Sequence, residues 1–296
     1  MKRVAVCICT FKREGMLDDL LASLSEADDG DFLLDIMIAD NDPLASARPV
    51  AERYTDRLNV SYVVESTRSI SAIRNTSVRV ALESNAELVA FLDDDQRVHP
   101  SWLRELVAAA DRENADAVAG PVVPVFEVNA PRWVRDGGFF SRPRHATGMK
   151  IRPSGIANVM VSSRVLRGIK DPFGRHFGRP GGEDTYFLSQ LAEAAGEPLW
   201  CDEAVVYEVV PADRASVRWL LLRHLRFGRN YSECLRLQRP PLTRLAVRGL
   251  VCCGRIAQGL VSIPILGLRG RSGFVRTAGR VLSGVGGLVG LGTSIQ

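Results

Sequence analysis

The first 95 residues alternate between short apolar runs and segments with a helical repeat of apolar side chains. The apolar runs are rich in β-branched residues, which predicts four strands, at residues 3–10, 32–39, 60–64 and 88–92. Apolar residues recur at helical spacing over residues 16–24 and 72–82, which predicts helices between the strands. This alternation indicates an α/β fold with a mostly parallel central sheet and helices on both faces.

Polar residues follow the carboxyl ends of three predicted strands. They occupy residues 10–13, 40–42 and 93–95. In open sheets of this kind, ligands bind beyond the carboxyl ends of the strands. The sequence therefore predicts a binding site formed by these three loops.

Three consecutive carboxylates, Asp93, Asp94 and Asp95, end the fourth strand abruptly. Hard divalent cations prefer oxygen ligands, and crowded carboxylates repel one another without a cation. Taken alone, the triplet is equally consistent with a solvated acidic turn before the next helix. Arg74 favours the interpretation of the triplet as part of a binding site, because its side chain is a permanent cation suited to a diphosphate.

Beyond residue 120 the pattern becomes richer in proline and glycine, up to a boundary near residue 213. Within this region, a helix is predicted at residues 185–195 and a strand at 204–210. The sequence Gly-Gly-Glu-Asp at 181–184 precedes that helix. Its glycines permit close backbone approach, and its acids lie at the positive end of the helix dipole. A simple N-terminal cap is the alternative interpretation.

Composition and charge divide the chain into unlike parts. Its 296 residues are 46% hydrophobic and 24% charged, which argues against fibrous and disordered classes. The net charge of +4 conceals 14 arginines against only Asp213 and Glu233 in residues 211–296. The six cysteines lack zinc-ligand spacing, so reduced thiols in a cytosolic protein are expected.

The C-terminal part has the composition of a membrane-surface segment. A helix predicted at residues 217–237 interleaves arginines with apolar and aromatic side chains, and an apolar, glycine-rich extension follows. Its longest charge-free stretches, 256–268 and 281–296, fall short of the ~18 residues of a clean membrane span. Basic and apolar faces on one helix fit the headgroup region of an anionic membrane. Nucleic acid is not expected as a partner, because no recognition motif is present and the rest of the chain is acidic.

Five motifs occur in a characteristic order: V-A-V-C-I-C-T-F-K-R, I-A-D-N-D, S-A-I-R-N, F-L-D-D-D and G-G-E-D. With them, residues 3–215 resemble the family 2 glycosyltransferases of the GT-A fold, especially those that build bacterial surface polysaccharides. The resemblance implies a nucleotide-sugar-binding half at residues 1–120 and an acceptor-binding half at 121–213. Residues 214–296 would then form a helical, membrane-associating region.

The resemblance also assigns the donor site. Its nucleotide-sugar-binding residues correspond here to Thr10, Phe11, Arg13, Asp40, Arg74, Asp93 and Asp94. Asp40 is expected to hydrogen-bond the uracil, and Arg74 to lie near the diphosphate. Asp95 is expected to bind Mn²⁺ or Mg²⁺ directly, with Asp93 nearer the ribose or a metal-bound water. Glu208 is a third candidate metal ligand, or an unrelated surface acid, at a position where relatives often have histidine.

The acceptor side of the resemblance rests on three residues. Asp184 corresponds to the general base that removes the proton of the acceptor hydroxyl. Glu183 is expected to orient the acceptor. Trp133 is expected either to stack on a sugar ring or to pack in a core.

These assignments imply an inverting, metal-dependent transferase that moves a sugar from a UDP-sugar to a lipid-linked or polysaccharide acceptor. It would act at the cytoplasmic face of the inner membrane, attached peripherally or monotopically. A nucleotidylyltransferase is one alternative, but residues 10–15 lack the glycine-rich, lysine-containing loop expected of it. A catalytically inactive membrane scaffold is the other, and the intact Asp93, Asp95 and Asp184 argue against it. The donor sugar, the acceptor and the oligomeric state are left open.

Overall fold

The computed structural model describes residues 1–28, 30–175, 177, 181–267 and 270–292. They form two compact units. We call residues 1–124, 142–179 and 186–209 the sheet unit, and residues 125–141, 180–185 and 210–296 the helical unit. These bounds differ from the three predicted segments, because part of the 121–213 region packs in each unit. Residues 268–269 and 293–296 of the predicted tail lie outside the described residues.

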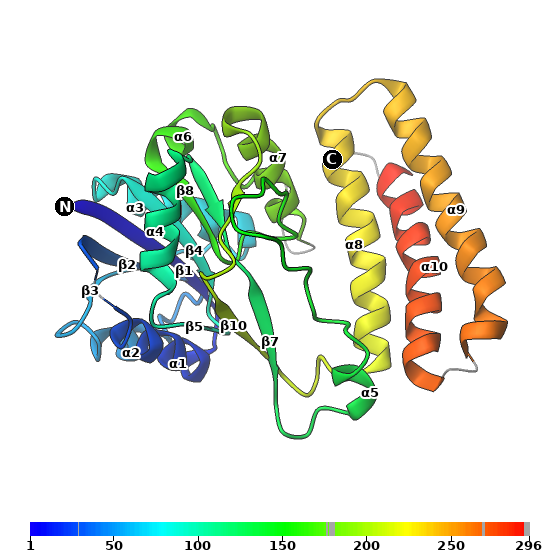
Figure 1. The fold of residues 1–296 in the computed structure, drawn as a ribbon, viewed down its shortest axis with the longest axis horizontal. Coiled ribbons are helices and arrows are strands. Elements are labelled where there is room, and N and C mark those ends of the chain that lie inside the picture. The colour runs from blue at the N-terminus through cyan, green and yellow to red at the C-terminus, as the bar shows by residue number, and fades with distance from the viewer. Residues whose placement is uncertain (29, 176, 178–180, 268–269, 293–296) are drawn as a thin grey trace. The chain divides into compact units, whose positions relative to one another are not determined.

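A seven-stranded sheet, in the order β3-β2-β1-β4-β8-β6-β9, forms the centre of the sheet unit (Figure 1). Its strands are β1 (Lys2–Thr10), β2 (Phe32–Asp40), β3 (Asn59–Val64), β4 (Leu88–Asp93), β6 (Ala117–Ala119), β8 (Val159–Ser162) and β9 (Leu199–Trp200). The first four strands are parallel, as predicted. β8 was not predicted, and it runs antiparallel to both β4 and β6.

Helices cover both faces of this sheet, which confirms the predicted fold (Figure 1). One group comprises α1 (Glu14–Ser25), α2 (Arg48–Glu52) and α4 (Trp102–Glu113), and the other α3 (Ile70–Glu83), α6 (Ser163–Gly168) and α7 (Glu183–Ala195). Successive side chains of β1 point to opposite faces. Ile8 packs in the same core cluster as Leu17 of α1, whereas Cys7 packs in the cluster that contains Val78 of α3.

A three-stranded sheet has the order β5-β10-β7, with β5 (Gln96–Val98), β7 (Val122–Phe126) and β10 (Val206–Val210). β5 begins directly after the acid triplet, and β10 runs antiparallel to it. The backbone N–H of Val209 donates to the carbonyl of Asp95 at 2.9 Å. β10 therefore holds the backbone of Asp95, the last residue of the acid triplet, in place.

Asn158, just before β8, joins several segments of the sheet unit. It is fully buried and has a left-handed φ of 63°. Its amide donates to the carbonyls of Pro121 and Ala204 at 2.9 and 2.8 Å, and its oxygen accepts from Trp102 Nε1 at 2.7 Å. This one side chain thus completes three buried hydrogen bonds.

We expect Asn158→Ala to lower the free energy of unfolding by about 3 kcal/mol or more, because it leaves buried polar groups without partners. Asn85→Ala is the matched control, since Asn85 has a similar φ of 61° but an exposed side chain. Urea unfolding followed by circular dichroism measures both changes. Equal losses in the two variants would show that backbone conformation, and not the hydrogen bonds, sets the cost.

The helical unit contains α8 (Val217–Leu237), α9 (Leu242–Gly267), α10 (Gly270–Gly292) and the short α5 (Arg132–Arg135). α10 packs against both α8 and α9 (Figure 1). Val134, Phe140, Leu220 and Val275 belong to the core cluster of this unit. A Cβ at Gly286 of α10 would overlap the Leu225 carbonyl, so glycine allows α10 to lie directly on the α8 backbone.

Candidate active site

The carboxyl ends of β1, β2 and β4 lie side by side, as the sequence predicts. In the strand register Thr10 is opposite Asp40, and Cys9 is opposite Asp93. β1 lies between the other two strands, so the loops after all three begin at one edge of the sheet. The parallel register thus gathers the polar loop residues of three strands at one place.

Asp94 is the buried centre of the acid triplet, with 4% of its surface exposed. Thr10 Oγ1 donates to one carboxylate oxygen and Arg13 Nη1 to the other, both at 2.9 Å. The same Arg13 atom lies 3.6 Å from Asp95. Burial raises the pKa of Asp94, although Arg13 and Thr10 act in the opposite direction. Thr10 and Arg13, predicted to line the nucleotide pocket, therefore hold the triplet in this structure.

Asp93 and Arg74 form an ion pair beside the triplet. Arg74 Nη2 lies 3.3 Å from Asp93 Oδ1, with side-chain exposures of 9% and 39%. The guanidinium also lies 5.8 Å from the centre of the Phe173 ring. Arg74 comes from the second turn of α3, whose start is capped by the Ser69 hydroxyl. This buried cation next to an accessible carboxylate is suited to binding a diphosphate.

Asp40 lies at the carboxyl end of β2, as predicted, and its carboxylate is bonded within the protein. Its carboxylate is fully buried and accepts from the N–H groups of Asp42 and Ala47, at 2.8 and 3.0 Å, and from the Tyr62 hydroxyl at 2.5 Å. Desolvation and the bond to Asp40 raise the pKa of Tyr62. Asp40 thus organises the loop after β2 in this structure, and its contact with uracil stays a prediction. Tyr62 was not singled out from the sequence, because no motif marks a tyrosine in β3.

Phe11 lies in the loop after β1, with its ring partly exposed. The guanidinium of Arg68 lies 4.7 Å from the ring centre, and Lys12 Nζ lies 5.5 Å from it. A flat ring flanked by cations is a suitable surface for a nucleotide. Arg68 was not assigned a role from the sequence, since it precedes the S-A-I-R-N motif.

The donor groups fit a cation that is shared with a ligand. Among the residues that the structure describes, no group of three or more His, Cys, Asp or Glu side chains forms a metal site. Glu208 pairs with Arg142 at 2.8 Å, so it coordinates a metal only if that pair opens. Asp93 and Asp95 remain as hard oxygen ligands. Mg²⁺ is commonly bound by one or two carboxylates together with phosphate oxygens and water, and this pair suits that mode.

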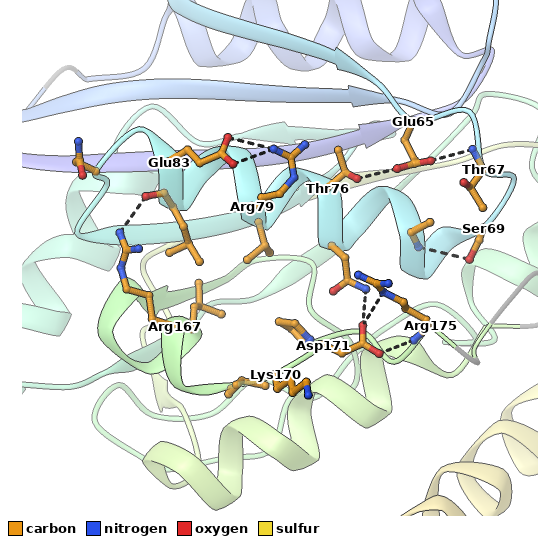
Figure 2. Close-up of a pocket in the computed structure, with 18 residues that line it drawn as sticks. Glu65, Thr67, Ser69, Thr76, Arg79, Glu83, Arg167, Lys170, Asp171 and Arg175 are labelled. Atoms are coloured by element: carbon orange, nitrogen blue, oxygen red, sulfur yellow. Dashed lines mark hydrogen bonds and ion pairs between the residues drawn. The ribbon is translucent and has the colours of Figure 1, made fainter.

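A groove of about 1250 Å³ runs between α3 and the segment that follows α6 (Figure 2). Asp171 accepts from Asn75 Nδ2 at 3.0 Å and from the Arg175 N–H at 2.8 Å. On the other side of the groove, Glu65 accepts from the Thr76 hydroxyl at 2.8 Å. Asp171 and Asn75 thus join the segment after α6 to the helix that carries Arg74.

Glu183 and Asp184 occupy the first turn of α7 and belong to the helical unit. Gly181 and Gly182 before them have φ values of +83° and +114°, which side chains with a Cβ rarely adopt. The acids therefore lie at a helix N-terminus, as predicted, and Glu183 is buried. The roles of Asp184 as base and of Glu183 in orienting the acceptor stay predictions.

Trp133 lies in α5 of the helical unit and is partly buried. Its ring packs edge-on against Phe139, with 5.8 Å between ring centres. Its carbonyl accepts from Ser272 Oγ of α10 at 2.9 Å. Trp133 therefore has a packing role in the helical unit, and its contact with a sugar stays a prediction.

This mostly parallel sheet, with helices on both faces, is the architecture of GT-A glycosyltransferases. The fold is similar to S. aureus TarS in complex with UDP-GlcNAc, with a TM-score of 0.58 and 14% identity over 97% of this chain and 91% of that one. A longer TarS structure is matched over 79% of this chain, with a TM-score of 0.56 and 15% identity. This chain spans 42% of that longer structure.

The sequence relatives identify the family. The model of Glycosyl transferase family 2 matches residues 5–168. The succinoglycan biosynthesis protein ExoM of Rhizobium meliloti (strain 1021) is 33% identical over 237 residues, which is 78% of this chain and 75% of ExoM. Validoxylamine A glucosyltransferase of Streptomyces hygroscopicus subsp. limoneus is 28% identical over 36% of this chain and 23% of its own length. The chain belongs to glycosyl transferase family 2 and is a glycosyltransferase, which confirms the resemblance seen in its motifs.

Proposed function

We propose that this glycosyltransferase is inverting and metal-dependent, and that it transfers a sugar from a UDP-sugar to a polysaccharide or lipid-linked acceptor in cell-envelope or exopolysaccharide biosynthesis. The observation that carries the proposal is the pairing of Asp93 with the buried Arg74 at the edge where β1, β2 and β4 end. ExoM, a succinoglycan biosynthesis protein, supports the acceptor class. TarS in complex with UDP-GlcNAc supports the donor class.

Each proposed residue has a distinct chemical task. Asp95 and Asp93 would hold the cation, and Arg74 would add positive charge beside the donor diphosphate. When bound, the cation would supply charge neutralisation for the departing UDP. Asp184 accepts the proton of the acceptor hydroxyl as that oxygen attacks the anomeric carbon. Inversion follows because a single displacement forms the new glycosidic bond as the bond to UDP breaks.

A panel of nucleotide-sugars tests this function. We expect slow, Mn²⁺- or Mg²⁺-dependent hydrolysis of one UDP-sugar, seen as UDP release, and faster release when the correct acceptor is added. Formation of pyrophosphate from a sugar phosphate and a nucleoside triphosphate would instead indicate a nucleotidylyltransferase. If no UDP-sugar in the panel is turned over with either metal, the proposed donor class or the proposed metal dependence is wrong.

The proposal includes attachment to an anionic membrane, at the cytoplasmic face of the inner membrane. Residues 211–296 carry 14 arginines against two acids, a net charge of +12, and the rest of the chain carries −8. Each basic residue near an anionic surface gains about 1 kcal/mol. One helix among the described residues, Leu242–Ser262, is long and apolar enough to cross a membrane, and 17% of its most apolar window is buried.

We expect the full-length protein to float with phosphatidylglycerol-containing vesicles at low salt, and to be released only in part by 1 M NaCl. Salt screens the arginines but not the contacts of apolar side chains. Vesicles of phosphatidylcholine alone are the control, and they should bind less protein. Complete release by salt would show that electrostatic attraction alone holds the protein on the vesicle. Absence of binding at low salt would contradict the membrane proposal.

A further inference from the structure

The outward face of α9 is apolar over most of its length. It comprises Leu242, Ala246, Val247, Leu250, Cys253, Gly254, Ala257, Leu260 and Val261, and one polar residue, Thr243, lies among them. At 3.6 residues per turn, these positions fall on one side of the helix. Leu250 and Val261 are 72% and 74% exposed, which is unusual for large aliphatic side chains that recur along one helix. Within the described part of the helical unit, this face is left to solvent.

Three arginines mark a different side of α9. Arg244, Arg248 and Arg255 are spaced by four and seven residues, so they follow one line along the helix. Arg244 and Arg255 are exposed, and Arg255 Nη1 also donates to Ser283 Oγ of α10 at 3.2 Å. Arg248 is buried, and it donates to Ser232 Oγ at 2.9 Å and to the Gly228 carbonyl at 3.3 Å.

The position of Arg255 decides how such a helix meets a bilayer. Residues 242–262 would span about 31 Å, close to the hydrocarbon thickness. A helix that crossed the bilayer would hold the exposed Arg255 within the hydrocarbon, which is costly for a charged side chain. A helix lying in the interface avoids this cost, because Arg244 and Arg255 reach headgroups while the apolar face enters the acyl region.

The other two long helices are less suited to this contact. On α8, Trp219 stacks on Phe140 with 5.6 Å between ring centres, and Leu220 is in the core. Leu222, Phe227 and Tyr231 of α8 are 45%, 56% and 50% exposed, which is less than Leu250 and Val261 of α9. The aromatic residues that made α8 the membrane-binding helix in the sequence interpretation are thus partly used for packing. α10 lies between α8 and α9, and a Cβ at Gly284 would come within 2.6 Å of the Cys252 carbonyl. One side of α9 therefore packs closely against α10, and the opposite side is exposed.

We infer that α9 lies flat in the headgroup region of an anionic membrane, apolar face inward, and does not cross the bilayer. Its charge complements the surface, since Arg244 and Arg255 are exposed and residues 242–262 contain no acid. The inference rests on the proposed membrane attachment and adds which helix makes the contact and in which orientation.

Vesicle binding tests the choice of helix. Leu250→Glu and Val261→Glu should each lower the affinity for phosphatidylglycerol-containing vesicles roughly tenfold or more, because the apolar side chain no longer enters the acyl region. Val128→Glu is the matched control, since Val128 is 93% exposed in the same unit but outside α9, and it should bind almost as wild type. Circular dichroism checks that each variant is folded. Wild-type binding by the two α9 variants would overturn the inference but leave membrane attachment intact, whereas failure of the wild type to bind would overturn both.

Spin labels test the orientation. Cys253 is exposed on the apolar face, and Ala246 and Leu260 lie seven residues before and after it. Each site is labelled alone, with Cys9→Ala throughout and Cys253→Ala where Ala246→Cys or Leu260→Cys carries the label. Oxygen and nickel-chelate accessibility should place all three labels at one depth in vesicles. A crossing helix would instead place Cys253 deepest, about 10 Å from each of the others along the bilayer normal. The inference would be overturned by that difference in depth. It would also be overturned if the three labels on vesicle-bound protein had the accessibility of labels in water.

Discussion

Asp95→Ala is expected to lower donor turnover by at least about 10³-fold, because a cation that neutralises the leaving diphosphate contributes several kcal/mol to the transition state. The fold should survive the change. Asp95 is buried at the end of a crowded acid triplet, and its removal relieves repulsion toward Asp94, whose pKa is already raised by burial. UDP release from the active donor, measured across a Mn²⁺ titration, gives the result.

Asp19→Ala is the control for Asp95→Ala. Asp19 also lies close to an arginine, with 2.6 Å to Arg97, but it is about half exposed and lies on the surface of the same unit. Its removal should change turnover by less than about twofold, since exposed ion pairs contribute little. If Asp95→Ala were fully active in saturating Mn²⁺, the assignment of Asp95 as the metal ligand would be wrong.

Asp184→Asn is expected to lower kcat by at least ~10²-fold, the effect typical of losing a general base. The amide keeps the shape of the side chain but cannot accept a proton from the acceptor hydroxyl. Donor affinity should be nearly unchanged, because only a step after binding is affected. Calorimetry with the donor and steady-state kinetics with the acceptor separate these two quantities.

Glu193→Gln makes the same chemical change on the same helix, at an exposed position in the last turns of α7. It should leave both kcat and donor affinity unaltered. Collapse of donor binding in Asp184→Asn, with normal turnover of the donor that still binds, would place Asp184 in the donor pocket and the base elsewhere.

The parallel half of the sheet was predictable because its apolar runs are long and end in sharp polar loops. β4 passes directly from the buried Leu92 to Asp93, and β1 passes from the buried Ile8 through Cys9 to Thr10. The strand register then brings these ends together. β8 was not predictable in the same way. It is four residues long, follows a proline-rich stretch, and depends on Asn158, which bonds groups distant in sequence.

The sequence predicted which residues lie at the site more readily than it predicted the hydrogen bonds between them. Motif order placed Thr10 and Arg13 near the acids, but only the structure shows both donating to Asp94. Likewise, the sequence placed Asp40 at the end of a strand, but only the structure shows that its carboxylate accepts from backbone donors of its own loop and from Tyr62. Such contacts depend on how loops close, which hydrophobic periodicity does not specify.

In the C-terminal region, composition predicted helices and a basic character, and both are present. It did not indicate which apolar residues remain exposed. The difference lies in tertiary packing, because Trp219 finds a partner in Phe140, whereas Leu250 remains 72% exposed.

Manganese binding in the presence and absence of UDP tests the central claim most directly. Free Mn²⁺ has a strong paramagnetic resonance signal that falls when the ion is bound. We expect little loss of signal with protein alone, since Asp93 and Asp95 offer only two carboxylates, and a stoichiometric loss when UDP is added beyond what UDP causes by itself. Asp95→Ala should abolish that additional loss. Identical titrations for the wild type and Asp95→Ala, with UDP present, would contradict a site in which the acid triplet holds the donor through a cation.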